Sequence, residues 1–154
     1  MRMTDSKLPY ADVKFCVNGN MRMFSRMLTQ YYDAAIAPAG ILFTQFMVLA
    51  VIANMNETTI NPLADALMMD RTTLTRALKP LQRDGLVESF NAEDDARKRL
   101  VRLTEAGQDV LDNAYPLWKQ TQTTVMNSLG DERWMQIFED MHQLLSELQN
   151  DDTN

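Results

Sequence analysis

Basic side chains are concentrated in one segment of the chain. Between Arg71 and Thr104 there are eight basic and five acidic residues, a net charge of +3, whereas the other residues are seven basic and sixteen acidic, a net charge of −9. The eight are Arg71, Arg76, Lys79, Arg83, Arg97, Lys98, Arg99 and Arg102. Lys and Arg neutralise phosphates, and a basic patch on an acidic body orients a protein on DNA. The segment therefore predicts a nucleic-acid contact, although the total charge of −6 argues against one.

A cap residue and the helical spacing of apolar positions predict the element that would make this contact. Asp70 can cap a helix that stops at Asp84-Gly85. Its buried face would carry Leu74, Leu78 and Leu81, which follow one another at i, i+4 and i+7. Its outward face would carry Thr72, Arg76, Lys79 and Arg83, with Thr73 and Thr75 near the N-terminal edge.

The outward residues have the chemistry to contact DNA. Threonine hydroxyls and methyls can meet base edges, and Arg76 is long enough for a bidentate contact to guanine, worth roughly 1–3 kcal/mol of discrimination. Lys79 and Arg83 are better placed for phosphates. The alternative is an ordinary solvated helix face.

Two short strands, at about 86–90 and 100–103, enclose a polar, acidic loop and predict a hairpin. Asp95 and Arg97 can pair within the turn, so that Arg97, Lys98 or Arg99 projects from it. An arginine on a narrow ribbon suits the minor groove. A charged hairpin that only protects a sheet edge is the alternative.

The other segments predict helices. A long first helix is expected over about residues 10–36, and Thr44 is expected to cap an apolar second helix that ends near Asn54. Asn61 should be the N-cap and Pro62 the first residue of a short helix to Met68, and Thr104 should cap a long helix. The last helix has an apolar stripe of Trp134, Ile137, Phe138, Met141, Leu144, Leu145 and Leu148.

Composition limits the classes of function. The 154 residues, 45% hydrophobic, suffice for one core, and no apolar run has the roughly 18 residues of a membrane span. We expect no membrane contact, no signal peptide and a cytoplasmic location. One His and one Cys exclude a disulfide within the chain and argue against metal or triad catalysis. We therefore expect no metal, no cofactor and no enzymatic activity.

Three runs carry a resemblance to a known family: FTQFMVLAVI, NPLADALMMDRTTLTRALKPLQRDGLV and DDARKRLVRLTEAG. They closely resemble the MarR family of winged helix-turn-helix regulators, and the similarity extends from Arg22–Asp33 to Pro116–Trp118. It implies a mostly α fold with a small β-hairpin wing and with N- and C-terminal dimerisation helices. The divisions would be residues 1–40 (N-terminal dimerisation helix), 41–106 (winged helix-turn-helix), 107–150 (C-terminal dimerisation helices) and 151–154 (disordered tail).

The resemblance also implies function. The protein would be a homodimer on double-stranded DNA, with two winged domains on a pseudopalindromic operator whose half-sites lie about one turn, roughly 34 Å, apart. Thr72, Thr73, Thr75 and Arg76 match the positions that contact bases, and Asp95 and Arg97 match the wing pair. A repressor released by a small ligand is the favoured hypothesis. A winged-helix protein-interaction module is the alternative, and an enzyme is a distant third.

Members of this family commonly bind small aromatic or phenolic effectors between the dimerisation helices and the winged domain. Residues that could line such a site are Arg22, Arg26, Tyr31, Tyr32 and Phe46. The alternative for Tyr31 and Tyr32 is an ordinary place in the core.

Cys16 raises a redox hypothesis, since peroxide-sensing members carry a reactive cysteine in the first helix that is hydrogen-bonded to two tyrosines. Alignment on Arg26–Thr29 places Cys16 about two residues too early, roughly 200° round a helix. Tyr32 matches one tyrosine, but Phe46 occupies the position of the other. A buried structural cysteine is therefore favoured over a redox sensor.

Overall fold

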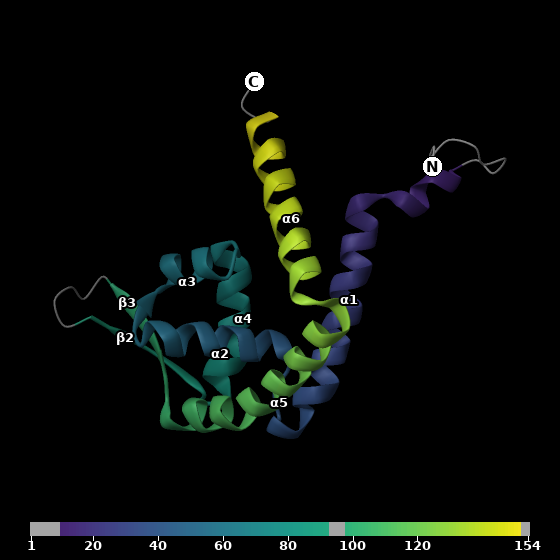
Figure 1. The fold of residues 1–154 in the computed structure, drawn as a ribbon. Helices are drawn as coiled ribbons and strands as arrows, with labels where there is room; N and C mark the ends of the chain where they lie inside the picture. Colours follow the sequence, from purple (N-terminus) through teal and green to yellow (C-terminus); the bar gives the residue numbers. More distant parts are fainter. Residues whose placement is uncertain (1–9, 93–97, 152–154) are drawn as a thin grey trace. The chain divides into compact units, whose positions relative to one another are not determined.

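The computed structural model describes residues 10–92 and 98–151. The elements, in chain order, are η1 (Ala11–Phe15), α1 (Val17–Ile36), η2 (Ala37–Ala39), α2 (Phe43–Met55), β1 (Thr58–Thr59), α3 (Ile60–Ala66), α4 (Arg71–Arg83), β2 (Val87–Asn91), β3 (Arg99–Leu103), α5 (Glu105–Leu129) and α6 (Asp131–Asp151) (Figure 1). The chain divides into two compact units, Met1–Tyr115 and Pro116–Asn154, and α5 belongs partly to each. The predicted fold class, mostly α with a small β-hairpin wing, is confirmed.

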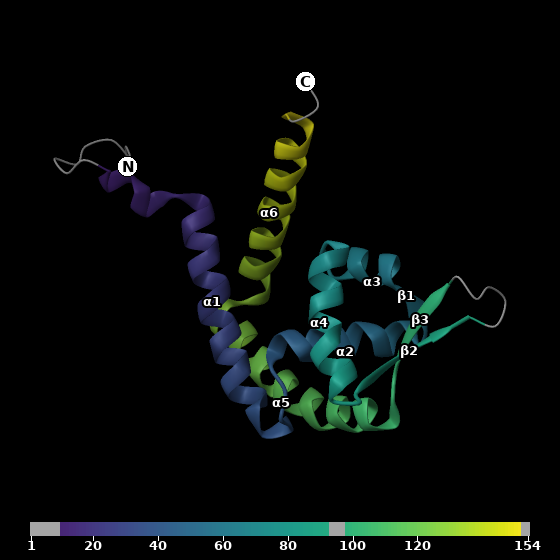
Figure 2. The ribbon, with the colours of Figure 1, turned by 180° about the vertical axis from the view of Figure 1, so that it is seen from behind.

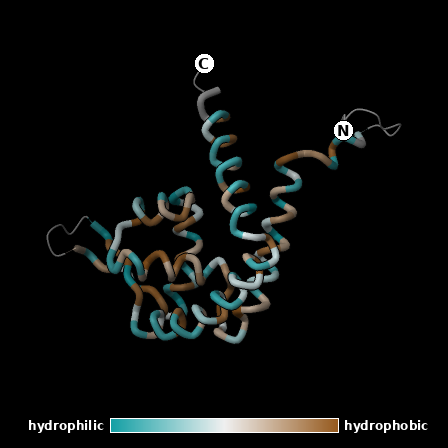
Figure 3. Tube along the Cα trace, viewed as in Figure 1, coloured by the Kyte–Doolittle hydropathy of each residue, from teal (hydrophilic) through white to brown (hydrophobic). Residues whose placement is uncertain are grey.

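Helix α2 forms the centre of the first unit, and its trace is largely apolar (Figure 3). Val48, Leu49 and Ile52 are at most 1% exposed. The helix begins at Phe43, so the expected cap at Thr44 is wrong. The Gln45 side chain accepts the Leu42 N–H at 2.9 Å, and Asp33 accepts the Phe43 N–H at 2.6 Å. These two acceptors satisfy free amides at the helix start, so a threonine cap is not needed.

The first predicted helix is shorter than expected. Continuous helix begins only at Val17, because Ala11–Phe15 is a 3-10 turn and Cys16 has an extended ψ of 119°. The Asn20 amide donates to the carbonyls of Lys14 and Cys16 at 2.8 and 2.9 Å. A side chain therefore satisfies the Lys14 carbonyl, which a continuous helix would pair with a backbone amide.

Helices α3 and α4 form the predicted helix-turn-helix, but α3 begins at Ile60, with Thr59 before it. The expected N-cap at Asn61 is therefore wrong. Pro62 lies in the first turn of α3, where no backbone N–H is needed, so its presence does not fix the first residue of the helix. Met68, in the turn before α4, has a φ of 51° and is 83% exposed.

The sheet has the order β1-β3-β2 and is antiparallel throughout. In the β2–β3 register, Val87 pairs with Leu103 and Asn91 with Arg99. The two hairpin strands confirm the prediction within one residue at their ends, whereas β1 was not predicted. Both views show the hairpin projecting away from α2, α3 and α4 (Figure 1, Figure 2).

The second unit contains the end of α5 and all of α6, which are separated by Gly130 at a φ of 87°. The predicted stripe of α6 lies on one face of a continuous helix, yet its large apolar residues, apart from Met141, are 36–54% exposed. The helix runs to Asp151, one residue into the predicted tail. The divisions predicted at residues 40, 106 and 150 concern function and stay a prediction.

Candidate nucleic-acid interface

Helix α4 is fixed by its inner face and by its cap. Leu74, Leu78 and Leu81 are 0, 2 and 0% exposed, as the spacing predicts. Asp70 caps the helix as expected: Oδ1 accepts the Thr73 N–H at 2.9 Å and Oδ2 accepts the Thr73 hydroxyl at 2.6 Å. The hydrogen bond from the Thr73 hydroxyl, followed by that from its backbone N–H, lowers the pKa of Asp70. The carboxylate therefore stays ionised at neutral pH.

The outward face of α4 holds the predicted cations in solvent. Arg71, Arg76 and Lys79 are exposed, and none of them forms an ion pair within residues 10–92 and 98–151. Thr72, Thr73 and Thr75 are exposed on the same N-terminal half of the helix. The structure thus brings six of the predicted site residues together on one helix whose opposite face is buried.

Two other basic residues of the segment, Arg83 and Arg102, form ion pairs. Arg83 pairs with Asp84 at 2.8 Å, and hydrogen bonding to that carboxylate raises the pKa of Arg83. Arg102 pairs with Glu88 at 2.7 Å and with Glu57 at 3.0 Å, which raises its pKa, and its guanidinium lies 4.5 Å from the centre of the Phe90 ring. These pairs are exposed and stabilise little. Arg102 of β3 is thus linked to Glu88 of β2 and to Glu57, the residue before β1.

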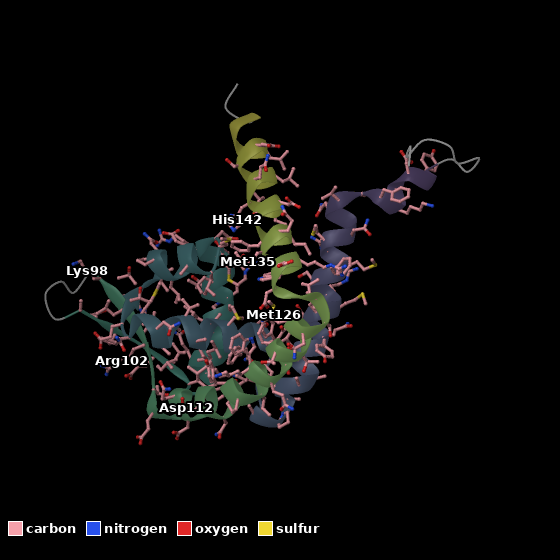
Figure 4. The ribbon with its side chains drawn as sticks, in the orientation of Figure 1. Lys98, Arg102, Asp112, Met126, Met135 and His142 are labelled. Atoms are coloured by element: carbon pink, nitrogen blue, oxygen red, sulfur yellow. The ribbon has the colours of Figure 1, made fainter. Side chains whose placement is uncertain are left out.

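The hairpin places only part of the predicted wing site. Lys98 and Arg99 are exposed at the start of β3, and the Lys98 carbonyl accepts the Ala92 N–H at 2.9 Å. Figure 4 shows Lys98 farther along the hairpin than Arg102. Asp95 and Arg97 lie outside the described residues, so the wing pair stays a prediction.

The root of the hairpin is tied to both neighbouring helices. Thr104 caps α5, as predicted, by accepting the Gly107 N–H at 3.0 Å, and its hydroxyl donates to the Gly85 carbonyl at 2.6 Å. A Cβ on Gly107 would lie 1.9 Å from the Leu86 carbonyl oxygen, so only glycine permits this approach. Gln82 of α4 also donates to Ser89 of β2 at 2.6 Å.

Sequence reasoning missed the positioning roles of Gly107, Gln82 and Arg102. Glu88 and Arg102 face each other in the strand register, so a hairpin prediction carried to residue pairs would have found that ion pair. Nothing local joins Arg102 to Glu57, which lies 45 residues earlier in the sequence.

The residues predicted for an effector site fall into two environments. Tyr32 and Phe46 are 7 and 2% exposed, and Tyr32 stacks on Phe43 with ring centres 4.7 Å apart. Burial, and then the neighbouring Tyr31, raises the pKa of Tyr32. Arg22 and Arg26 border a shallow, open hollow on α1 alone, and Tyr31 is 50% exposed. The five residues thus lie in different environments, and the effector site stays a prediction.

Cys16 is exposed, so the preference for a buried structural cysteine is wrong for the single chain. Cys16 lies between η1 and α1. A Cβ added to Gly19 would lie 3.6 Å from the Cys16 Cβ and 3.8 Å from the Cys16 Sγ. The redox hypothesis stays a prediction.

The described residues contain no cluster of three or more His, Cys, Asp or Glu side chains that could hold a metal ion. In the same part of the chain, no single helix is long and apolar enough to cross a membrane. By length and composition a membrane span is matched only by two helical segments taken together, Val17–Ala39 and Phe43–Met55, and these are bent by 72° with respect to each other.

Known proteins are similar to the part of the chain that holds α2, α3, α4 and β2. The family model for the MarR family matches residues 43–98. The transcriptional regulator MosR of M. tuberculosis, in its structure with DNA, is 38% identical, with a TM-score of 0.76 over 88% of this chain and 97% of that one. The chain belongs to the MarR family.

Two further relatives agree with this assignment. The organic hydroperoxide resistance transcriptional regulator of Bacillus subtilis (strain 168) is 30% identical over 54% of this chain and 56% of its own length. The chain thus matches about half the length of this curated relative. A mutant MarR from E. coli complexed with operator DNA is 23% identical, with a TM-score of 0.78 over 91% of this chain and 99% of that one, which shows a shared fold.

Proposed function

We propose that this MarR-family chain is a non-enzymatic transcriptional regulator that inserts α4 into the major groove of double-stranded DNA. One observation carries the proposal: Arg71, Arg76 and Lys79 are exposed without an ion pair among the described residues, whereas Arg83 and Arg102 of the same basic segment are paired. Unpaired cations on a rigid helix can release counterions and contact bases without first breaking protein contacts.

Each residue then has a role in the complex. Arg76, four residues after Thr72 on the outward face, would donate to a guanine edge, and Arg71 and Lys79 would neutralise phosphates. Arg83 would contribute only by exchanging Asp84 for a phosphate. Asp95, Arg97, Lys98 and Arg99 would form the wing site, with Arg97 in the adjacent minor groove.

The proposal includes a homodimer. The stripes of α1 (Val17, Met21, Phe24 and Leu28) and α6 leave large apolar side chains 36–60% exposed in the single chain. Patches of this kind on a helix favour association, and a second copy is the simplest occupant because most oligomers are symmetric. Two α4 helices roughly 34 Å apart would then contact the half-sites of a pseudopalindromic operator.

The test is selection of DNA from a random 40-base-pair duplex library (roughly four turns), followed by fluorescence anisotropy on an enriched duplex. We expect Arg76→Ala to weaken binding about 10-fold or more, the effect of a lost bidentate contact. Lys79→Ala should weaken all duplexes alike and reduce the salt slope by about 1. Lys119→Ala, which removes an exposed cation on α5, is the matched control and should change neither quantity.

Failure to enrich any duplex at low salt would contradict the proposal and favour the protein-interaction module. Equal losses from Arg76→Ala and Lys119→Ala would show that DNA is held by general charge and not by α4.

Repression relieved by a small aromatic or phenolic effector is the remaining part of the proposal. Benzoate and phenol are suitable probes, added at rising concentration to the complex with the enriched duplex. Release that is weakened by Arg26→Ala but not by Lys119→Ala would support an effector site near α1, and DNA binding unchanged by either compound would contradict one for this chemical class.

A further inference from the structure

The three threonines of α4 differ in what their side chains can still offer to DNA. The Thr75 hydroxyl donates to the Arg71 carbonyl at 2.7 Å, and the Thr73 hydroxyl donates to Asp70 at 2.6 Å. The Thr72 hydroxyl has no hydrogen bond to the described residues, and Thr72 is exposed. Two of the three hydroxyl protons are therefore already in use before any DNA arrives.

These hydrogen bonds also fix the direction of each methyl group. A threonine that bonds back to the carbonyl of residue i−4 has its χ1 angle set, and the methyl occupies the other branch of the same Cβ. Thr73 is held more firmly still, because Asp70 accepts both its hydroxyl and its backbone N–H. The hydroxyl bond has a charged acceptor and a length typical of strong bonds of this kind.

Thr73 and Thr75 lie on opposite sides of the Thr72–Arg76 row. At 100° per residue, Thr73 and Thr75 are displaced by roughly 80° to either side of the centre of that row. Both residues are exposed, and the nearest cations on the face are Arg71, Arg76 and Lys79. The helix thus presents hydrogen-bond donors along its centre and a fixed apolar group at each edge.

We infer that Thr73 and Thr75 recognise thymine through their methyl groups, in contact with the thymine C5-methyl, and that Thr72 is the threonine of α4 that hydrogen-bonds to a base or a phosphate. The inference rests on the proposed function. It predicts an operator half-site in which thymines flank the base pair that Arg76 contacts.

Thr75 provides the sharpest test, measured as the affinity of the selected duplex. Thr75→Val keeps the methyl and removes the hydroxyl, so its affinity should stay within about twofold of the original; Thr75→Ser does the reverse and should weaken binding about fourfold, the cost of one methyl group left uncovered. Thr73→Ser keeps the bond to Asp70 and should show a similar loss. Thr123 is the matched control, because its hydroxyl also donates to an i−4 carbonyl, that of Lys119, at 2.9 Å. Neither Thr123→Val nor Thr123→Ser should change the affinity for the duplex.

Replacement of thymine by uracil in the duplex completes the cycle, because it removes only the C5-methyl. With uracil placed only at the thymine on the Thr75 side of the Arg76 base pair, the original protein and Thr75→Val should each lose about fourfold, whereas Thr75→Ser should lose little more because Thr73 keeps its own thymine. Retained affinity in Thr75→Ser with loss in Thr75→Val would overturn the inference in favour of a hydroxyl contact. A library that enriches no duplex would instead refute the proposed function and the inference with it.

Discussion

Helices α4 and α6 carry equally regular apolar stripes, but the stripe of α4 is buried and that of α6 is exposed. In α4 the three leucines of the stripe are 0–2% exposed, held beneath a polar outer face. In α6 the stripe is longer, yet Leu144, Leu145 and Leu148 are 42, 53 and 54% exposed. Teal and brown segments alternate along α6 in Figure 3.

The difference shows that periodicity predicts a helix and its faces but not what covers them. The first unit buries the α4 stripe against elements of the same chain, such as α2 and β2. Nothing in the described part of the second unit covers the α6 stripe. The two helices should therefore respond differently to the same kind of substitution.

Leu74→Ala should give the largest effect, on folding. Truncation of a fully buried leucine costs about 2–5 kcal/mol, through lost burial and a residual cavity. Urea denaturation followed by circular dichroism would measure it, with Thr72→Ala on the exposed face as control, expected within about 0.5 kcal/mol. Equal effects of the two would mean that α4 is not anchored as described.

Gly107→Ala should come next, because the added Cβ would lie 1.9 Å from the Leu86 carbonyl oxygen and backbone must move. A cost of about 1–3 kcal/mol is expected, as for other overpacked sites. Ala106→Gly, at the exposed position next to it, is a control for the change in helix propensity. A Gly107→Ala variant as stable as the original would show that the close approach is not needed.

Leu145→Ala in α6 should leave the first unit folded and instead weaken self-association, by about 10-fold in the dissociation constant. Sedimentation equilibrium at several protein concentrations would measure it. Glu139→Ala, on the opposite side of α6, is the matched control. A monomeric original protein, or a dimer that is insensitive to Leu145→Ala, would contradict a role for α6 in dimerisation.

The smallest effect concerns pH at the α4 cap. Hydrogen bonds from Thr73 lower the pKa of Asp70 in the folded state, so the carboxylate adds stability at pH values above its unfolded pKa of 3.8. That contribution is lost as the pH falls through the lowered folded value. The stability difference between the original protein and Asp70→Asn should shrink from about pH 5 toward pH 2. A stability difference that stayed constant over this range would contradict the role of the Asp70 carboxylate as a cap.

Local patterns predicted α4 most completely, including the Asp70 cap, the buried leucines and the end near Asp84-Gly85, because every determinant lies within the helix and its flanks. The predicted start of α2 was wrong because the first backbone N–H groups donate to Asp33 and Gln45 rather than to Thr44. Strand β1 has only two residues, too short for any periodicity, and exists because Thr58 and Thr59 pair with β3.

For the candidate site, too, residue type predicted the local features but not the contacts that form only on folding. The sequence identified the cations of α4, but pairing decides which of them are available, and Arg83 and Arg102 are paired. Partners such as Glu57 and Arg102 meet only after folding, 45 residues apart in the sequence. The state of the threonine hydroxyls depends on geometry that residue type does not reveal.

The contacts of Thr104 and Gly107 with Gly85 and Leu86, together with the Gln82–Ser89 bond, give the wing the mechanics of a cantilever. A beam built into its support cannot pivot there, and its deflection grows with distance from the fixed end. Val87 and Leu103, next to this root, are therefore held more firmly than Asn91 and Arg99, far along β2 and β3. In the proposed complex the protein would thus set the distance from α4 to the root of the wing, and any adjustment to the groove would fall on the far end of the hairpin.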